Sequence, residues 1–264
     1  MNLYFLKLGG SLITDKNNPH TPRLDVLHRL AVEIHTAVIE QPDLRLVIGH
    51  GSGSFGHIPA HQYHTRDGVR SALEWSGFIE VWQEARALNQ IVVESLENAG
   101  LPVIAMPPSA SVTAADGQVS KWDLAPMQSA LAAGLMPLVN GDTIFDTHRG
   151  GTILSTEELF FHLARQLKPR RIVLAGIETG VWADFPTCSQ LIENITPDGF
   201  EQVAGRLGGS SAVDVTGGML TKVRTMLNLV EDVPGLEILI FSGMVPGNVS
   251  LALSGKETGT RIRK

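Results

Sequence analysis

The sequence predicts an α/β fold of three layers, in which a central, largely parallel sheet is covered by helices on both faces. Two observations favour this architecture. Short apolar runs of strand length alternate along the chain with longer segments whose apolar residues recur at helical spacing. Several of the apolar runs also end in glycine-rich turns. Alternating strands and helices are typical of parallel sheets that are buried on both sides.

The elements follow from these patterns in chain order. In the first half we expect strands at 3–8, 44–48, 103–106 and 136–140, helices at 25–40, 72–99 and 125–133, a polar loop at 11–22, and a hairpin-like stretch at 111–119. In the second half we expect a helix at 156–167, a strand at 171–175, a turn at 176–180, a helix at 219–229 and a strand at 237–241. No repeat or linker interrupts the pattern, so residues 1–264 are expected to form one domain.

Composition excludes several classes of function. The net charge of the 264-residue chain is −6 and its lysines and arginines are dispersed, so no basic face for nucleic acid is expected. Cys188 is the only cysteine, which excludes an intrachain disulfide and a cysteine zinc cluster and is typical of the cytoplasm. The chain shows no signal-peptide pattern and no run approaching roughly 20 apolar residues. We therefore expect a soluble, unprocessed cytoplasmic protein without a membrane partner.

Four glycine-rich segments carry the strongest functional signal: 7–11, 50–57, 140–142 and 216–222. Glycine lets backbone N–H groups approach an anion closely, and each segment also holds a lysine, a histidine or a carboxylate. Together the four segments predict a site that handles several phosphates at once.

Two lysines flank the first glycine turn. Lys7 precedes it at the end of a strand and Lys16 follows on the same loop, so both ammonium groups can converge on one phosphoryl group. The alternative is a solvated lysine beside a tight turn. In the second segment, the amides of 51–56 can surround an anion while His57 points toward it. The segment lacks the acidic partner of a dinucleotide fingerprint, and the chain has no Walker A motif.

The other two segments add a carboxylate and a third cation. Asp142 follows a strand and can either hold the two lysines in position, reach Mg²⁺ through water, or simply cap a turn. Lys222 lies one turn inside a helix that begins after glycines, where it suits the terminal phosphates of a nucleotide. A capped helix with an exposed lysine is the alternative.

Two further patterns are ambiguous. His57, His61 and His64 are spaced to share a helix face, but no cysteine or nearby carboxylate completes a metal site, so we expect no protein metal ligands. The apolar stripe formed by Trp75, Phe78, Ile79 and Trp82 is typical of a buried core. Its position after His57 also makes it a candidate wall for an apolar substrate tail.

These pieces together resemble the amino acid kinase superfamily and, within it, the isopentenyl phosphate kinase family. The resemblance runs nearly end to end, through Leu6 to Lys16, His50 to His57, Asn140 to Asp142, Asp214 to Met219 with Lys222, and Gly255 to Thr260. The combination of Thr14-Asp15-Lys16 with Ser54-Phe55-Gly56-His57 is its most specific part.

The resemblance implies a role for each segment. ATP phosphates are expected along Lys7, Gly9, Gly10, Ser11, Ser52, Gly217, Gly218 and Lys222, and the acceptor against Gly51, Ser52, Gly53, His57, Gly141 and Thr156. Lys16 is expected to stabilise the transferring phosphoryl group, with Lys7, His57 and Asp142 as the other catalytic residues.

The implied activity is phosphorylation of isopentenyl phosphate by ATP and Mg²⁺ in isoprenoid biosynthesis. An acceptor-binding lobe at about 1–165, a nucleotide-binding lobe at about 166–264 and a homodimer are implied as well. A fosfomycin-kinase-like enzyme of the same fold and a non-catalytic nucleotide-binding module are the alternatives.

Three segments depart from the family pattern. Ser52 replaces a glycine, 155–158 reads Ser-Thr-Glu-Glu in place of a Ser-Gly-Asp-Asp-like segment, and 176–180 lacks a Thr-Asp-Val-Asp-Gly pattern. The last two affect the expected nucleotide preference and substrate contacts, and the phosphate-handling residues are unaffected.

Overall fold

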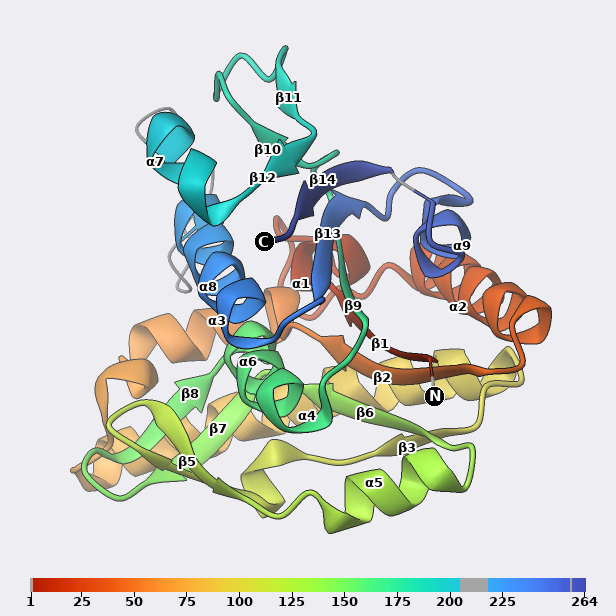
Figure 1. Cartoon of the computed structure of the whole chain (residues 1–264). Helices are drawn as coiled ribbons and strands as arrows, with labels where there is room; N and C mark the ends of the chain where they lie inside the picture. Colours follow the sequence, from red (N-terminus) through yellow and green to blue (C-terminus); the bar gives the residue numbers. More distant parts are fainter. Residues whose placement is uncertain (1, 205–217, 257) are drawn as a thin grey trace.

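The computed structural model describes residues 2–204, 218–256 and 258–264, and their main feature is one large twisted sheet (Figure 1). Its strands lie in the order β12 (Asn194–Ile195), β14 (Gly259–Ile262), β13 (Glu237–Ser242), β9 (Arg171–Gly176), β1 (Asn2–Leu8), β2 (Leu44–His50), β6 (Met136–Asn140) and β3 (Val103–Ala105). Neighbouring strands are parallel except for the β13–β14 pair, which is antiparallel. The predicted largely parallel sheet is confirmed.

Both faces of the sheet are buried, and β1 shows why. Leu3 and Phe5 point into one apolar core, whereas Tyr4, Leu6 and Leu8 point into the other. Successive side chains of a strand face opposite sides, so a strand between two helical layers must be apolar at nearly every position. This explains why the strands appear in the sequence as continuous apolar runs.

Helices cover each face. On one face lie α2 (Leu24–Glu40), α4 (Ala72–Asn98) and α9 (Asn248–Leu253), and on the other α5 (Ala125–Ala132), α6 (Thr156–Leu167) and α8 (Gly218–Asp232). Figure 1 shows α2 beside α9 and α6 beside α8, in agreement with their packing. The three-layer α/β/α prediction is therefore confirmed. None of the described helices combines the length and apolar content needed to cross a bilayer.

Several elements differ from the sequence prediction. The hairpin of β4 (Val112–Ala115) and β5 (Gln118–Trp122) is confirmed, but it extends into a four-stranded sheet through β7 (Asp142–Asp146) and β8 (Gly150–Leu154). The other unpredicted elements are α3 (Gly53–Gln62), η1 (Thr65–Asp67), η2 (Pro108–Ala110), β10 (Val181–Trp182), β11 (Leu191–Ile192), β12, α7 (Pro197–Ala204), α9 and β14. In Figure 1 the four-stranded sheet lies at lower left and the β10–β11 hairpin at the top.

The segment expected to be a polar loop begins with a helical turn, α1 (Gly10–Ile13). The N–H groups of Leu12 and Ile13 donate to the carbonyl of Gly9 at 2.9 and 3.2 Å, and both side chains are fully buried. The loop prediction was wrong for these residues because two apolar side chains on the turn pack into the core.

Candidate active site

The predicted turns meet at the carboxyl ends of neighbouring strands. Because β9, β1, β2 and β6 lie side by side, the residues that follow each strand are brought together at one edge of the sheet. Main-chain hydrogen bonds join them in sequence: Gly9 N–H to Ala175 O (2.8 Å), Gly51 N–H to Leu8 O (3.2 Å) and Gly141 N–H to His50 O (3.1 Å). The glycine turns at 9–10, 51–53 and 141 therefore form one continuous backbone surface.

The first two turns approach so closely that side chains cannot fit between them. A Cβ atom on Gly10 would lie 2.5 Å from the nitrogen of Gly53, and one on Gly51 would lie 3.1 Å from the nitrogen of Gly10. Thr14 fastens the turns together, since its hydroxyl donates to Gly10 O at 2.8 Å and accepts from Ser54 N–H at 2.9 Å. Glycine is required here by the contact between the turns.

A cavity opens over this surface, and most predicted site residues line it. Those residues are Lys7, Gly9, Gly10, Ser11, Lys16, Gly51, Ser52, His57, Gly141, Asp142, Thr156 and Lys222. Gly53 packs against Gly10 and is not among the lining residues. Gly218 is the first residue of α8, and Gly217 lies outside the described residues.

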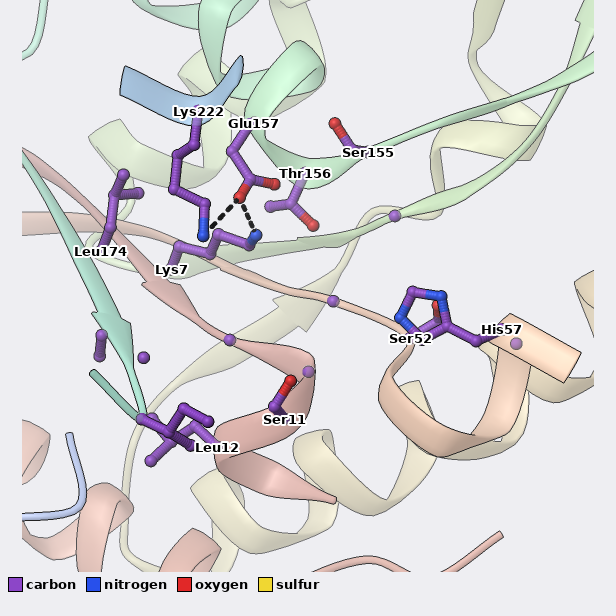
Figure 2. Close-up of a pocket in the computed structure, with 18 of the residues that line it drawn as sticks. Lys7, Ser11, Leu12, Ser52, His57, Ser155, Thr156, Glu157, Leu174 and Lys222 are labelled. Atoms are coloured by element: carbon purple, nitrogen blue, oxygen red, sulfur yellow. Dashed lines mark ion pairs between the residues drawn. The ribbon is translucent and has the colours of Figure 1, made fainter. Parts of the chain in front are cut away.

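A largely buried carboxylate, Glu157, joins two of the lysines (Figure 2). Its Oε1 atom contacts Lys7 Nζ and lies 3.7 Å from Lys222 Nζ, and its side chain is only 13% exposed. Burial alone raises the pKa of Glu157, but the charges of Lys7 and Lys222 outweigh it and hold the pKa at about 2. Two cations against one anion leave this part of the cavity positive, which suits a polyphosphate.

Asp142 lines the cavity together with Lys7 and Lys16, and its catalytic role stays a prediction. Its carboxylate accepts hydrogen bonds from Ser109 N–H at 3.0 Å and Thr143 N–H at 2.8 Å, which ties η2 to β7. Burial raises the pKa of Asp142, and the hydrogen bonds from Ser109 and Thr143 oppose the rise. The carboxylate that the structure places against both Lys7 and Lys222 is Glu157.

The start of α6 explains how Glu157 comes to face the lysines. Ser155 caps the helix: Glu158 N–H donates to its hydroxyl at 3.3 Å, and the carboxylate of Glu158 accepts from Ser155 N–H at 2.7 Å. Arg66 adds a 2.6 Å ion pair to Glu158. Thr156 donates its hydroxyl to His50 O at 2.6 Å, so this predicted substrate contact also anchors the helix to β2. Both anchors fix the rotation of the first helical turn.

One end of the cavity is mostly apolar and carries His57, which projects from α3, together with Arg66, whose guanidinium donates to Ile153 O at 3.4 Å. In Figure 2, His57 lies on the opposite side of the cavity from Lys222. Apolar lining residues at this end come from α3, α4 and β8, namely Ala60, Val81, Ala85, Ile153 and Leu154. This arrangement suits a ligand with a small apolar part joined to an anion.

The aromatic stripe on α4 does not form this wall. Trp75 packs against Phe78 and Phe145, with ring centroids 5.2 and 6.0 Å apart, and none of the three is among the lining residues. Val81 and Ala85 of the same helix line the cavity. The interpretation of the stripe as the substrate wall was therefore wrong, because the helix turns a neighbouring set of positions toward the ligand space.

The opposite end combines aromatic and aliphatic side chains with one acid. Trp182 and Phe185 line it together with Ile177, Glu178 and Ile240. The indole N–H of Trp182 donates to the carboxylate of Glu178 at 3.2 Å, which fixes both side chains. Flat aromatic faces beside a hydrogen-bonding group are suited to a planar heterocycle.

The described part of the chain contains no preformed cluster of metal ligands. No group of three or more histidine, cysteine or acidic side chains within the described ranges is arranged to hold a metal ion. His64 lies beyond the end of α3 with a φ of +50°, so it does not continue the face that carries His57 and His61. A magnesium ion in this cavity could take most of its ligands from phosphate oxygens and water, as Mg²⁺ commonly does.

Comparison with known proteins decides the family. The family model described as "Amino acid kinase family" matches residues 2–242. The chain belongs to the amino acid kinase family. This amino acid kinase is 35% identical to the isopentenyl phosphate kinases of Methanothermobacter thermautotrophicus and Haloferax volcanii. The alignment with the first covers 98% of this chain and 98% of the relative. The alignment with the second covers 100% of this chain and 99% of the relative.

Solved structures agree with the family assignment. This amino acid kinase superimposes on an isopentenyl phosphate kinase crystal structure with a TM-score of 0.82 and 31% identity, over 98% of this chain and 99% of the other. The chain therefore has the fold of these kinases over nearly its whole length.

Proposed function

We propose that this protein transfers the γ-phosphoryl group of ATP to isopentenyl phosphate, giving isopentenyl diphosphate and ADP. The observation that carries the proposal is the layout of the cavity: cations and glycine amides lie between an apolar end with His57 and an aromatic end with Trp182. This arrangement suits two ligands whose phosphates face each other: a nucleoside triphosphate with its base at the aromatic end, and a small phosphate ester with its hydrocarbon tail at the His57 end. Near full-length similarity to isopentenyl phosphate kinases supports the substrate.

Lys7, Lys222 and Lys16 are proposed to neutralise the donor phosphates. Lys7 and Lys222 are held by Glu157 before any ligand arrives, so little reorganisation is needed when a triphosphate binds. Lys16 lines the same cavity from the loop after α1, where it suits the transferring phosphoryl group. The glycine turns add backbone N–H donors. Those of Gly9, Gly10, Ser11 and Gly218 are proposed to contact the phosphates of the nucleotide.

The acceptor phosphate is proposed to bind at His57 and the Gly51–Ser52 turn, with its hydrocarbon tail between Val81 and Ala85. An anionic oxygen of this phosphate attacks the γ-phosphorus, and the bond from that phosphorus to the bridging oxygen of ADP breaks. The nucleophile is already an anion, so no general base is needed, and catalysis consists of alignment and charge neutralisation. ADP leaves with the electron pair of the broken bond.

ATP and Mg²⁺ are the proposed cofactors. When bound, the metal would neutralise charge on the phosphate oxygens, and the protein contributes its lysines and amides around them. Full dependence of turnover on added Mg²⁺, lost with EDTA and restored by excess Mg²⁺, is the expected result. Undiminished turnover in EDTA would contradict the metal requirement.

A coupled ADP-release assay tests the function directly. Isopentenyl phosphate, dimethylallyl phosphate and fosfomycin are offered in turn with Mg·ATP, and ADP release without an acceptor is the blank. We expect isopentenyl phosphate to give the highest kcat/KM. Preferred turnover of fosfomycin would favour the phosphonate kinase alternative, and no turnover with any acceptor would favour a non-catalytic nucleotide-binding module.

The remaining proposals concern organisation. We propose a single domain whose acceptor lobe spans about 1–165 and whose nucleotide lobe spans about 166–264, which agrees with the placement of His57 and Trp182 at opposite ends of the cavity. A cytoplasmic homodimer without nucleic-acid or membrane partners is proposed from the resemblance, the dispersed charge and the free thiol of Cys188. Light scattering and cell fractionation test these points.

A further inference from the structure

A second histidine, His50, lies directly behind the cavity and is not explained by the function above. It is the last residue of β2, is fully buried, and is not among the residues that line the cavity. Its Nδ1 atom lies 3.1 Å from the carbonyl oxygen of Gly51, and its Nε2 atom lies 3.0 Å from the side-chain oxygen Oδ1 of Asn89 on α4. The imidazole therefore connects α4 to the second glycine turn.

The neutral form of the ring determines which atom donates. Burial lowers the pKa of His50 and the charge of Lys7 acts in the same direction, against the opposing effect of the hydrogen bonds to Asn89 and Gly51. A neutral imidazole has one donor and one acceptor, and a carbonyl oxygen can only accept. As placed, both ring nitrogens face oxygen atoms. The Gly51 carbonyl has no donor to offer, whereas the Asn89 amide can be turned by half a turn to present its NH₂ group. The neutral ring therefore satisfies both contacts only when Nδ1–H donates to Gly51 O and Nε2 accepts from the turned Asn89 amide.

This hydrogen bond also fixes a neighbouring N–H group. In a planar trans peptide the carbonyl of one residue and the N–H of the next point in opposite directions. The carbonyl of Gly51 points toward the buried imidazole, so the N–H of Ser52 points away from it, and both residues line the cavity. The preceding peptide is fixed as well, because Gly51 N–H donates to Leu8 O at 3.2 Å.

We propose that His50, held by Asn89, is a positioning residue that locks the Gly51–Ser52 peptide so that Ser52 N–H donates to the phosphoryl group in transfer. The inference rests on the proposed function. A lock is needed because glycines on both sides of Ser52 let the peptide rotate, and Gly53 already adopts a φ of +51°. Rotation would replace an N–H donor with a carbonyl oxygen facing a phosphate.

Kinetics of paired variants test the proposal. His50→Leu removes the donor, whereas His50→Asn keeps an N–H near the place of Nδ1. We expect His50→Leu to lower kcat with isopentenyl phosphate roughly 30- to 100-fold, as loss of an oriented transition-state donor does, with less than about a threefold change in KM. His50→Asn should recover most of kcat. Asn89→Leu should lower kcat by about tenfold, since the ring loses its second anchor.

Two controls and one spectroscopic measurement complete the test. His28→Leu on the exposed face of α2 and Gln90→Leu beside Asn89 should leave kcat unchanged. Long-range ¹⁵N–¹H NMR of the unliganded wild-type protein should show His50 as the neutral Nδ1–H tautomer. This readout is independent of turnover and remains available if His50→Leu does not fold.

The outcomes separate the two proposals. A wild-type protein that does not phosphorylate isopentenyl phosphate refutes the proposed function, and the tautomer still tests the geometry. An active wild type with kcat of His50→Leu or Asn89→Leu within about threefold of normal overturns the positioning role. A His50 ring protonated only at Nε2 overturns it as well.

Discussion

Glu157→Gln is the substitution whose effect follows most directly from the structure. It removes the negative charge that Lys7 and Lys222 share while keeping the shape of the side chain. The pKa of Glu157 lies at about 2 instead of its ordinary value of 4.5, which corresponds to about 3 kcal/mol of stabilisation of the charged carboxylate. For a chain of this size, a loss of that order lowers Tm by roughly 6 to 12 °C.

The pH dependence of this stabilisation has a defined sign. Because the pKa of Glu157 is lower in the folded protein, its contribution is fully present above pH 4.5 and is lost as the pH falls toward 2. The difference in unfolding free energy between wild type and Glu157→Gln should therefore be constant near neutral pH and shrink below pH 4.5. Scanning calorimetry across this range measures it, with Glu97→Gln at the exposed end of α4 as the matched control.

Ligand binding gives the same substitution a second readout. In Glu157→Gln the two lysines lack their counter-charge, which a triphosphate can supply, so ATP should raise Tm by more in the variant than in the wild type. Turnover should fall roughly a hundredfold, since the lysines are no longer held in place before the transition state. A variant with Tm within about 1 °C of wild type at pH 7 and normal kcat would refute the assigned role of Glu157.

The remaining predictions address the ends of the cavity and its third cation. Lys16→Ala should lower kcat roughly a hundredfold. Tm should not change, because Lys16 is exposed and its charge is expected to act only on the phosphoryl group in the transition state. Near-normal turnover would exclude this role. His57→Ala should raise KM for isopentenyl phosphate and lower kcat, and if neither changes, the acceptor assignment fails. Ala85→Phe should raise KM for isopentenyl phosphate about tenfold while KM for ATP stays constant; equal KM values in variant and wild type would show that the tail binds elsewhere.

Much of the fold is evident in the sequence because its strands are buried on both faces. The runs at 3–8 and 171–175 are apolar at nearly every position, and no other kind of strand requires that. The two-residue strands β10 and β11 could not be predicted, since two residues show no periodicity. β7 and β8 escaped prediction because the residues after Gly141 were interpreted only as a turn with a functional carboxylate.

The cavity was partly predictable for a related reason. Parallel strands carry their ligand-binding turns at one edge, so Lys7, Gly51 and Gly141 were expected to converge once their strands were identified. Glu157 was not predicted, because an acid in the first turn of a helix is also typical of ordinary helix starts. Its departure from the family pattern at 155–158 was the only signal in the sequence.

A crystal structure with isopentenyl phosphate and a non-hydrolysable ATP analogue tests the central claim most directly. The account predicts a triphosphate against Lys7 and Lys222, and the acceptor phosphate about 3 Å from the His57 ring, with its tail between Val81 and Ala85. A nucleotide bound away from the two lysines, or a His57 ring turned out of the cavity, would contradict it.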